Sequence, residues 1–61
     1  MSPFDEGAAL FEEQPELLAA AVWREASKLY QDIDTCRDFV NGYITRRLRR
    51  DEFMQEKKSA P

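Results

Sequence analysis

Histidine is missing from this sequence of 61 residues, and cysteine occurs only once, at Cys36. Without histidine the chain lacks the commonest general base and the usual activator of a Ser or Cys nucleophile, so catalysis is not expected. A single Cys cannot form an internal disulfide, and one Cys without His supplies no ligand set for a structural zinc ion. We therefore predict no enzyme activity, no metal site and no cofactor.

Long apolar runs are also missing, and the longest uncharged stretch in the early part of the chain is Leu17–Trp23. A membrane span needs about 20 predominantly apolar residues. The N-terminal residues have neither the basic region nor the apolar segment of a secretory signal. An unpaired Cys is common inside cells and a liability outside them. These features predict a cytoplasmic protein.

Glycine and proline are scarce after Pro15, where only Gly42 and Pro61 occur. Apolar residues recur at alternating steps of three and four, the spacing of one helix face. They are Ala19, Val22, Ala26, Leu29, Ile33, Cys36, Val40 and Tyr43, and Trp23, Tyr30 and Ile44 widen the stripe. Strand-like alternation is absent, so we predict an all-α fold.

The break between helices is ambiguous in the sequence. Thr35 and Asp38 form an imperfect capping box, which favours an antiparallel hairpin with helices near 16–31 and 36–50. The alternative is one long continuous helix, because neither Gly nor Pro interrupts the run. We predict a helical hairpin domain over 15–54 that self-associates into a bundle, followed by a frayed tail over 55–61.

The first 14 residues are expected to form an acidic arm or a short helix. Ser2 and Pro3 resemble a helix start, because they supply a capping side chain and a Pro at the first helical position. Gly7 should weaken that helix by up to about 1 kcal/mol relative to Ala. A helix and a disordered arm both remain open.

Charge is distributed unevenly. Residues 1–38 hold nine acidic and three basic residues, a balance of −6, whereas residues 39–61 hold three acidic and six basic residues, a balance of +3. Parallel packing of two copies would place like charges side by side. Antiparallel packing, within one chain or between two chains, places acidic residues against basic ones.

A chain of this size buries only about 60% of the surface that its unfolded form exposes, so a partner surface is expected. We predict that the partner is a second, antiparallel copy, a larger protein, or both. The predicted partner interface consists of Val22, Trp23, Leu29, Tyr30, Ile33, Phe39, Val40, Tyr43 and Ile44.

Four arginines cluster in the second half of the sequence, at Arg46, Arg47, Arg49 and Arg50. They could bind the phosphates of a nucleic acid. Alternatively, they form a solvated helix end whose charge complements the helix dipole. The sequence pI near 4.8 disfavours nucleic-acid binding, since proteins that bind nucleic acids are usually basic. Binding to nucleic acid is therefore the alternative prediction.

Residues 37–40 (Arg-Asp-Phe-Val), followed by Ile44 and by Arg46-Arg47-Leu48, resemble the second helix of Sda-type inhibitors of sporulation histidine kinases. Residues 16–18 (Glu-Leu-Leu) are similar to the start of the first helix of that family. The segment between the two stretches is several residues longer here. The resemblance implies a small antiparallel hairpin with a regulatory binding role, in which Phe39 would contact the partner. We predict a small non-catalytic protein–protein interaction module, acting as a regulator or assembly factor.

Overall fold

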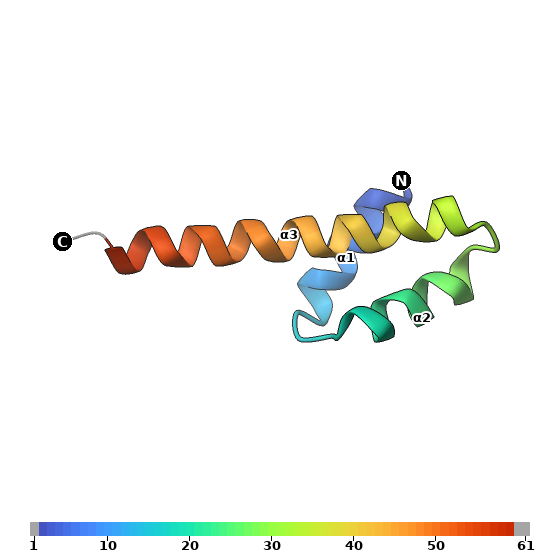
Figure 1. Cartoon of the computed structure of the whole chain (residues 1–61), viewed down its shortest axis with the longest axis horizontal. Helices are drawn as coiled ribbons and strands as arrows, with labels where there is room; N and C mark the ends of the chain where they lie inside the picture. Colours follow the sequence, from blue (N-terminus) through green and yellow to red (C-terminus); the bar gives the residue numbers. More distant parts are fainter. Residues whose placement is uncertain (1, 60–61) are drawn as a thin grey trace.

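Three helices make up the chain in the computed structural model, which describes the backbone of residues 2–59 and the side chains of residues 2–51. They are α1 (Pro3–Glu13), α2 (Ala19–Leu29) and α3 (Ile33–Ser59). The helix α3 defines the long axis, and α1 and α2 both lie against its first half (Figure 1). No strand occurs within residues 2–59, which confirms the all-α prediction.

The first helix begins as the sequence predicts. Ser2 is its N-cap, and the Ser2 hydroxyl accepts a hydrogen bond from the backbone N–H of Asp5 at 3.2 Å. Pro3 occupies the first turn, where its missing N–H has no intrahelical partner to lose. Of the two possibilities left open for residues 1–14, the structure has the helix, and this helix is part of the core rather than an arm.

The crossing of α1 and α3 depends on two glycines, Gly7 and Gly42, both of which are buried. A methyl group built on Gly7 would overlap the backbone carbonyl of Phe39, and one built on Gly42 would overlap the backbone carbonyl of Phe4. The missing side chains therefore let the two helix backbones meet directly. In the sequence Gly7 predicts only a weak point in a helix, whereas in the structure it is a contact surface between α1 and α3.

The chain breaks between α2 and α3 at residues 30–32, so the alternative of one continuous helix is wrong. Asp32 caps α3: its carboxylate accepts a hydrogen bond from the backbone N–H of Thr35 at 3.1 Å and another from the Thr35 hydroxyl at 3.1 Å. The predicted Thr35–Asp38 box is not the cap. The third helix therefore starts at Ile33, three residues before the predicted position near 36.

The core lies where all three helices meet, and it consists of Phe11, Val22, Ala26, Cys36, Phe39, Val40 and Tyr43. The rings of Phe11 and Tyr43 pack edge to face, with their centroids 5.3 Å apart. The Tyr43 hydroxyl donates a hydrogen bond to the carbonyl of Gln14 at 2.6 Å and accepts one from the N–H of Leu17 at 2.9 Å. One side chain of α3 thereby fixes the connection between α1 and α2.

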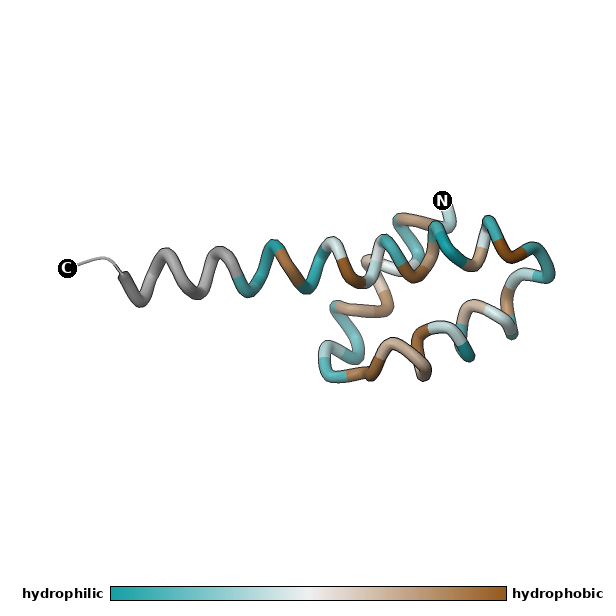
Figure 2. Tube along the Cα trace, viewed as in Figure 1, coloured by the Kyte–Doolittle hydropathy of each residue, from teal (hydrophilic) through white to brown (hydrophobic). Residues whose placement is uncertain are grey.

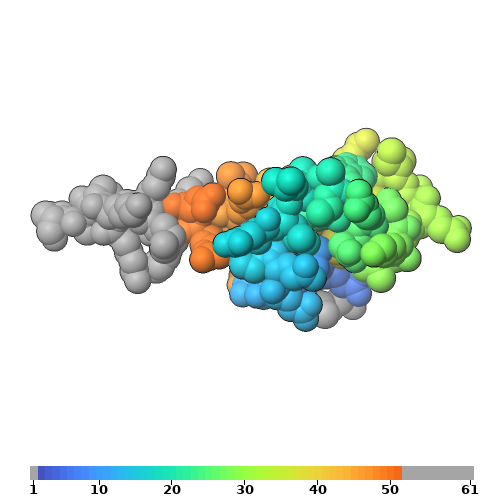
Figure 3. All heavy atoms as spheres, turned by 90° about the horizontal axis from the view of Figure 1, so that it is seen from below, coloured from blue at the N-terminus to red at the C-terminus, as the bar shows by residue number. Residues whose placement is uncertain are grey.

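The third helix is much longer than its two neighbours, with 27 residues against 11 in each of α1 and α2. In the space-filling view its orange portion extends past the atoms of α1 and of the α1–α2 connection (Figure 3). The helix continues to Ser59, beyond the predicted start of fraying at 55. The last residues of the predicted tail, Ala60 and Pro61, lie outside the described residues, as do the side chains of 52–59.

Candidate partner-binding face

Four residues of the predicted interface lie in the core of the single chain. Val22, Phe39, Val40 and Tyr43 are all buried by contacts among the three helices. The sequence pattern had identified an apolar face correctly but had not counted α1 as the element that covers much of it. In this fold these four side chains are not available to a partner. This includes Phe39, which the resemblance to Sda-type inhibitors had implied as a contact residue.

Two members of the same apolar stripe are exposed instead. Leu29 is 61% exposed and Ile33 is 65% exposed, so the three helices of one chain leave these two residues of the predicted partner interface uncovered. Both residues adjoin the break at residues 30–32, where the chain turns from α2 into α3 (Figure 1). The break interrupts the helix on which the apolar stripe would have continued. Two further residues of α3, Ile44 and Leu48, are 38% and 56% exposed.

Three of the exposed large apolar residues, Ile33, Ile44 and Leu48, lie on one side of α3 and line two hollows, and we call this surface the α2–α3 face. One hollow on it is lined by Leu17, Ala19, Tyr43, Ile44, Arg47, Leu48 and Asp51. The second is lined by Trp23, Ser27, Tyr30, Gln31, Ile33 and Cys36. Because residues three or four apart share a helix face, both hollows lie on the same side of α2 and of α3. Hydrophobic residues, coloured brown, recur along the part of α3 that is not drawn in grey (Figure 2).

Leu48 was missing from the predicted interface, although its position four residues after Ile44 was a usable signal. It stands between Arg47 and Arg49, two members of the arginine cluster. Trp23 and Tyr30, which were predicted, are partly buried and pack against the core from this face. The α2–α3 face thus combines half-buried aromatic residues with exposed aliphatic ones.

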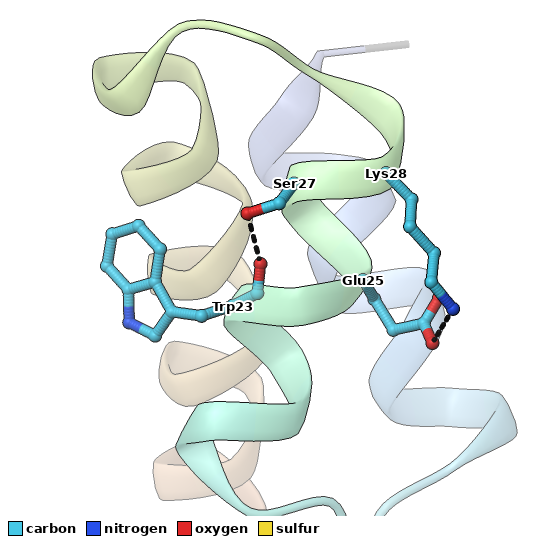
Figure 4. Close-up of polar contacts among 4 residues, drawn as sticks. All are labelled: Trp23, Glu25, Ser27 and Lys28. Carbon is cyan, nitrogen blue, oxygen red and sulfur yellow. Dashed lines mark hydrogen bonds and ion pairs between the residues drawn. The ribbon is translucent and has the colours of Figure 1, made fainter.

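A second, smaller groove lies between α1 and α2. Its apolar lining includes Leu10 and Leu29, and three glutamates, Glu6, Glu13 and Glu25, stand at its edge. Figure 4 shows that the Trp23 indole and the Glu25–Lys28 ion pair, with its nitrogen and oxygen 3.3 Å apart, extend from different sides of α2. The Tyr30 hydroxyl donates to the Glu6 carboxylate, so two of the three acids, Glu6 and Glu25, are already engaged within the chain.

The four clustered arginines do not form a uniform basic surface. Arg46 binds the Glu12 carboxylate through two nitrogens at 2.8 and 2.9 Å. The Arg50 guanidinium lies 5.8 Å from the centre of the Phe11 ring. A pocket of about 360 Å³ beside them is lined by Phe11, Glu12, Pro15, Arg46, Arg49 and Arg50. Two of the four arginines thus contact α1 in their own chain.

The Arg46–Glu12 pair joins the acidic first part of the sequence to its basic second part within one chain.

Among the described side chains, no group of three or more His, Cys, Asp or Glu residues is arranged to hold a metal ion. None of the described helical segments is long and apolar enough to cross a membrane. Comparison with family models, with curated proteins and with solved structures finds no match for this chain.

Proposed function

We propose that this chain is a small non-catalytic interaction module, a regulator or assembly factor that binds a protein partner through the α2–α3 face. One observation carries the proposal. The chain fills a core with its own three helices and still leaves Ile33, Ile44 and Leu48 exposed on one side of α3. Exposed large apolar side chains that share one side of a helix, beside half-buried aromatic residues, favour an interaction site.

The composition of the face supports binding rather than chemistry. Half-buried Trp23 and Tyr30 are amphipathic aromatic residues of the kind that dominate binding energy at interfaces. The chain contains no histidine to serve as a general base. We place the module in the cytoplasm, where the free thiol of Cys36 would stay reduced.

The proposal is tested by affinity capture from the native host, with partners quantified by mass spectrometry. Leu48→Glu puts a charge on the α2–α3 face, and Leu29→Glu puts the same charge into the groove between α1 and α2. Both positions are exposed, so both variants should fold. A partner of this face is recovered with the wild type and with Leu29→Glu, and at least about tenfold less with Leu48→Glu.

Self-association counts as partner binding in this test and is measured separately by sedimentation of the purified chain. The proposal is refuted if the purified chain is monomeric and no captured protein depends on Leu48. Loss of a partner in Leu29→Glu alone would point to the groove between α1 and α2 and would contradict the assignment of the face.

The alternative function, binding of nucleic acid through the arginine cluster, has less support. Arg46 contacts Glu12, and Arg50 contacts Phe11. Among the described side chains, Arg47 and Arg49 make no such ion pair or cation–π contact with α1. Nonspecific binding grows with the number of phosphates that are neutralised, and two cations neutralise few.

A further inference from the structure

Arg37, Ile44 and Asp51 are spaced seven residues apart on α3. Seven residues correspond to almost two helical turns, so the three side chains lie nearly on one line along the helix. All three are exposed. This line runs beside Ile33 and Leu48 on the α2–α3 face, with a base on one side of a central Ile and an acid on the other.

The charges on this line complement those on the same line of a second copy that runs in the opposite direction. If a second copy packs against α3 in the antiparallel direction with Ile44 on the two-fold axis, Arg37 of each copy lies opposite Asp51 of the other. A parallel arrangement would oppose Arg37 to Arg37 and Asp51 to Asp51, and like charges across an interface are unfavourable. An isologous interface of this kind contains each contact twice.

We propose that the partner of the α2–α3 face is a second copy of this chain, paired antiparallel about Ile44. This inference rests on the proposed function and specifies the partner and the register. Positions 33–55 of the two α3 helices would overlap, which corresponds to about 34 Å of helix. Leu48 extends the apolar contact on both sides of the axis, and the hollow beside Leu17 and Ala19 receives apolar side chains of the other copy.

Charge has a specific role in this arrangement. Arg37 is at the edge of the face, where its guanidinium lies 4.0 Å from Asp34 in the same helix, and both side chains are largely exposed. Exposed ion pairs add little affinity, so the apolar residues hold the dimer together. The Arg37–Asp51 pairs select the antiparallel direction and the register.

A disulfide across the axis tests the register. In Ile44→Cys the two new thiols would face each other, and antiparallel helices in contact bring such positions within the Cα separation that a disulfide accepts, about 4.4–6.8 Å. Under mild oxidation most of this variant should become a covalent dimer. The wild type, whose Cys36 is buried, and Leu29→Cys, on another side of α2, should remain uncross-linked. Cross-linking of Ile44→Cys no greater than that of Leu29→Cys overturns the register.

Charge reversal tests the direction independently. We expect Arg37→Glu and Asp51→Arg each to raise the dimer dissociation constant about tenfold in sedimentation equilibrium, because each variant creates two like-charge pairs. The combined variant restores opposite charges and should return to within about threefold of the wild type. Single variants without effect, or a combined variant without recovery, would contradict the antiparallel pairing. Circular dichroism checks that each variant keeps its helices.

These outcomes separate the dimer from the broader function. A wild type that sediments as a monomer up to about 100 μM, together with no cross-link in Ile44→Cys, overturns the dimer. The interaction module would then still stand if a different protein were captured in a manner that depends on Leu48. Failure of both experiments would refute both proposals.

Discussion

Helix propensity and the packing of α1 against α3 predict opposite effects on stability when Gly7 is replaced by alanine. In an isolated helix the change adds up to about 1 kcal/mol of stability. In the folded chain the new Cβ would lie inside the 3.0 Å that such atoms keep from their neighbours, against the backbone carbonyl of Phe39. A backbone carbonyl within a helix cannot swing away as a flexible side chain can. The helices α1 and α3 must therefore separate.

The size of the effect follows from the cost of that separation. Forcing extra volume into a packed contact costs about 1–3 kcal/mol, and separation also loosens Phe11 and Tyr43. We expect Gly7→Ala to lower the free energy of unfolding by up to about 2 kcal/mol, because the propensity gain offsets part of the overpacking cost. A domain of 60–100 residues loses about 4–8 °C in melting temperature for each kcal/mol.

Urea unfolding at one fixed protein concentration measures the change, with Trp23 fluorescence and circular dichroism as probes. Asn41→Ala is the matched control, because Asn41 is an exposed residue of α3 next to Gly42, and it should raise stability by a few tenths of a kcal/mol. Gly42→Ala should behave as Gly7→Ala does. The double glycine variant should lose less than the two single losses combined, since one separation of the helices relieves both contacts. A Gly7→Ala midpoint at or above that of the wild type would refute the close crossing.

Further substitutions test other parts of the structure and the alternative function. Tyr43→Phe should cost about 1–2 kcal/mol in urea unfolding, because the N–H and carbonyl groups that its hydroxyl binds lose their partner; no loss would mean that the hydroxyl does not hold the connection. Asp32→Ala should cost about 1 kcal/mol and Asp32→Asn much less, since Asn is also a good cap; equal losses would contradict the capping role. Ile33→Ala should cost under about 1 kcal/mol at low protein concentration, whereas Phe39→Ala costs about 3–5 kcal/mol, and the reverse order would contradict the burial of the two side chains. In a gel mobility assay at low salt, DNA and RNA should show no salt-sensitive shift; a shift lost in Arg47→Ala would favour nucleic-acid binding instead.

Local signals in the sequence predicted the helical class and the first helix start. Ser2 and Pro3 indicate a cap in any context, because the hydrogen bond that they enable reaches only three residues along the chain. The repeat of apolar residues also placed Val22, Val40 and Tyr43 on one face. A repeat shows which residues share a face, but it does not show which element covers that face. The packing of α1 on α3 was therefore missed, and buried residues were assigned to a partner.

Two other errors have the same physical origin. Gly7 and Gly42 have no side chain to create a pattern, so only the tertiary contact reveals their role. The break at residues 30–32 contains neither Gly nor Pro, and Asp32 alone signals it. Asp is a weak helix former and also a good cap, and the sequence did not decide between these roles. The exposure of Ile33 followed from that break.

The position of the Gly7–Gly42 crossing has a consequence for how the chain reaches its fold. Gly7 and Gly42, which form the crossing, are far apart in the sequence. The hydrogen bond from the Tyr43 hydroxyl to the Gln14 carbonyl likewise joins two distant segments of the chain. Such long-range closures must overcome the entropy of the intervening chain before they add stability. A nascent chain that has emerged only through α2 lacks every buried residue of α3. We therefore expect early fragments of the polypeptide to remain unstructured, with folding delayed until the middle of α3 has been synthesised.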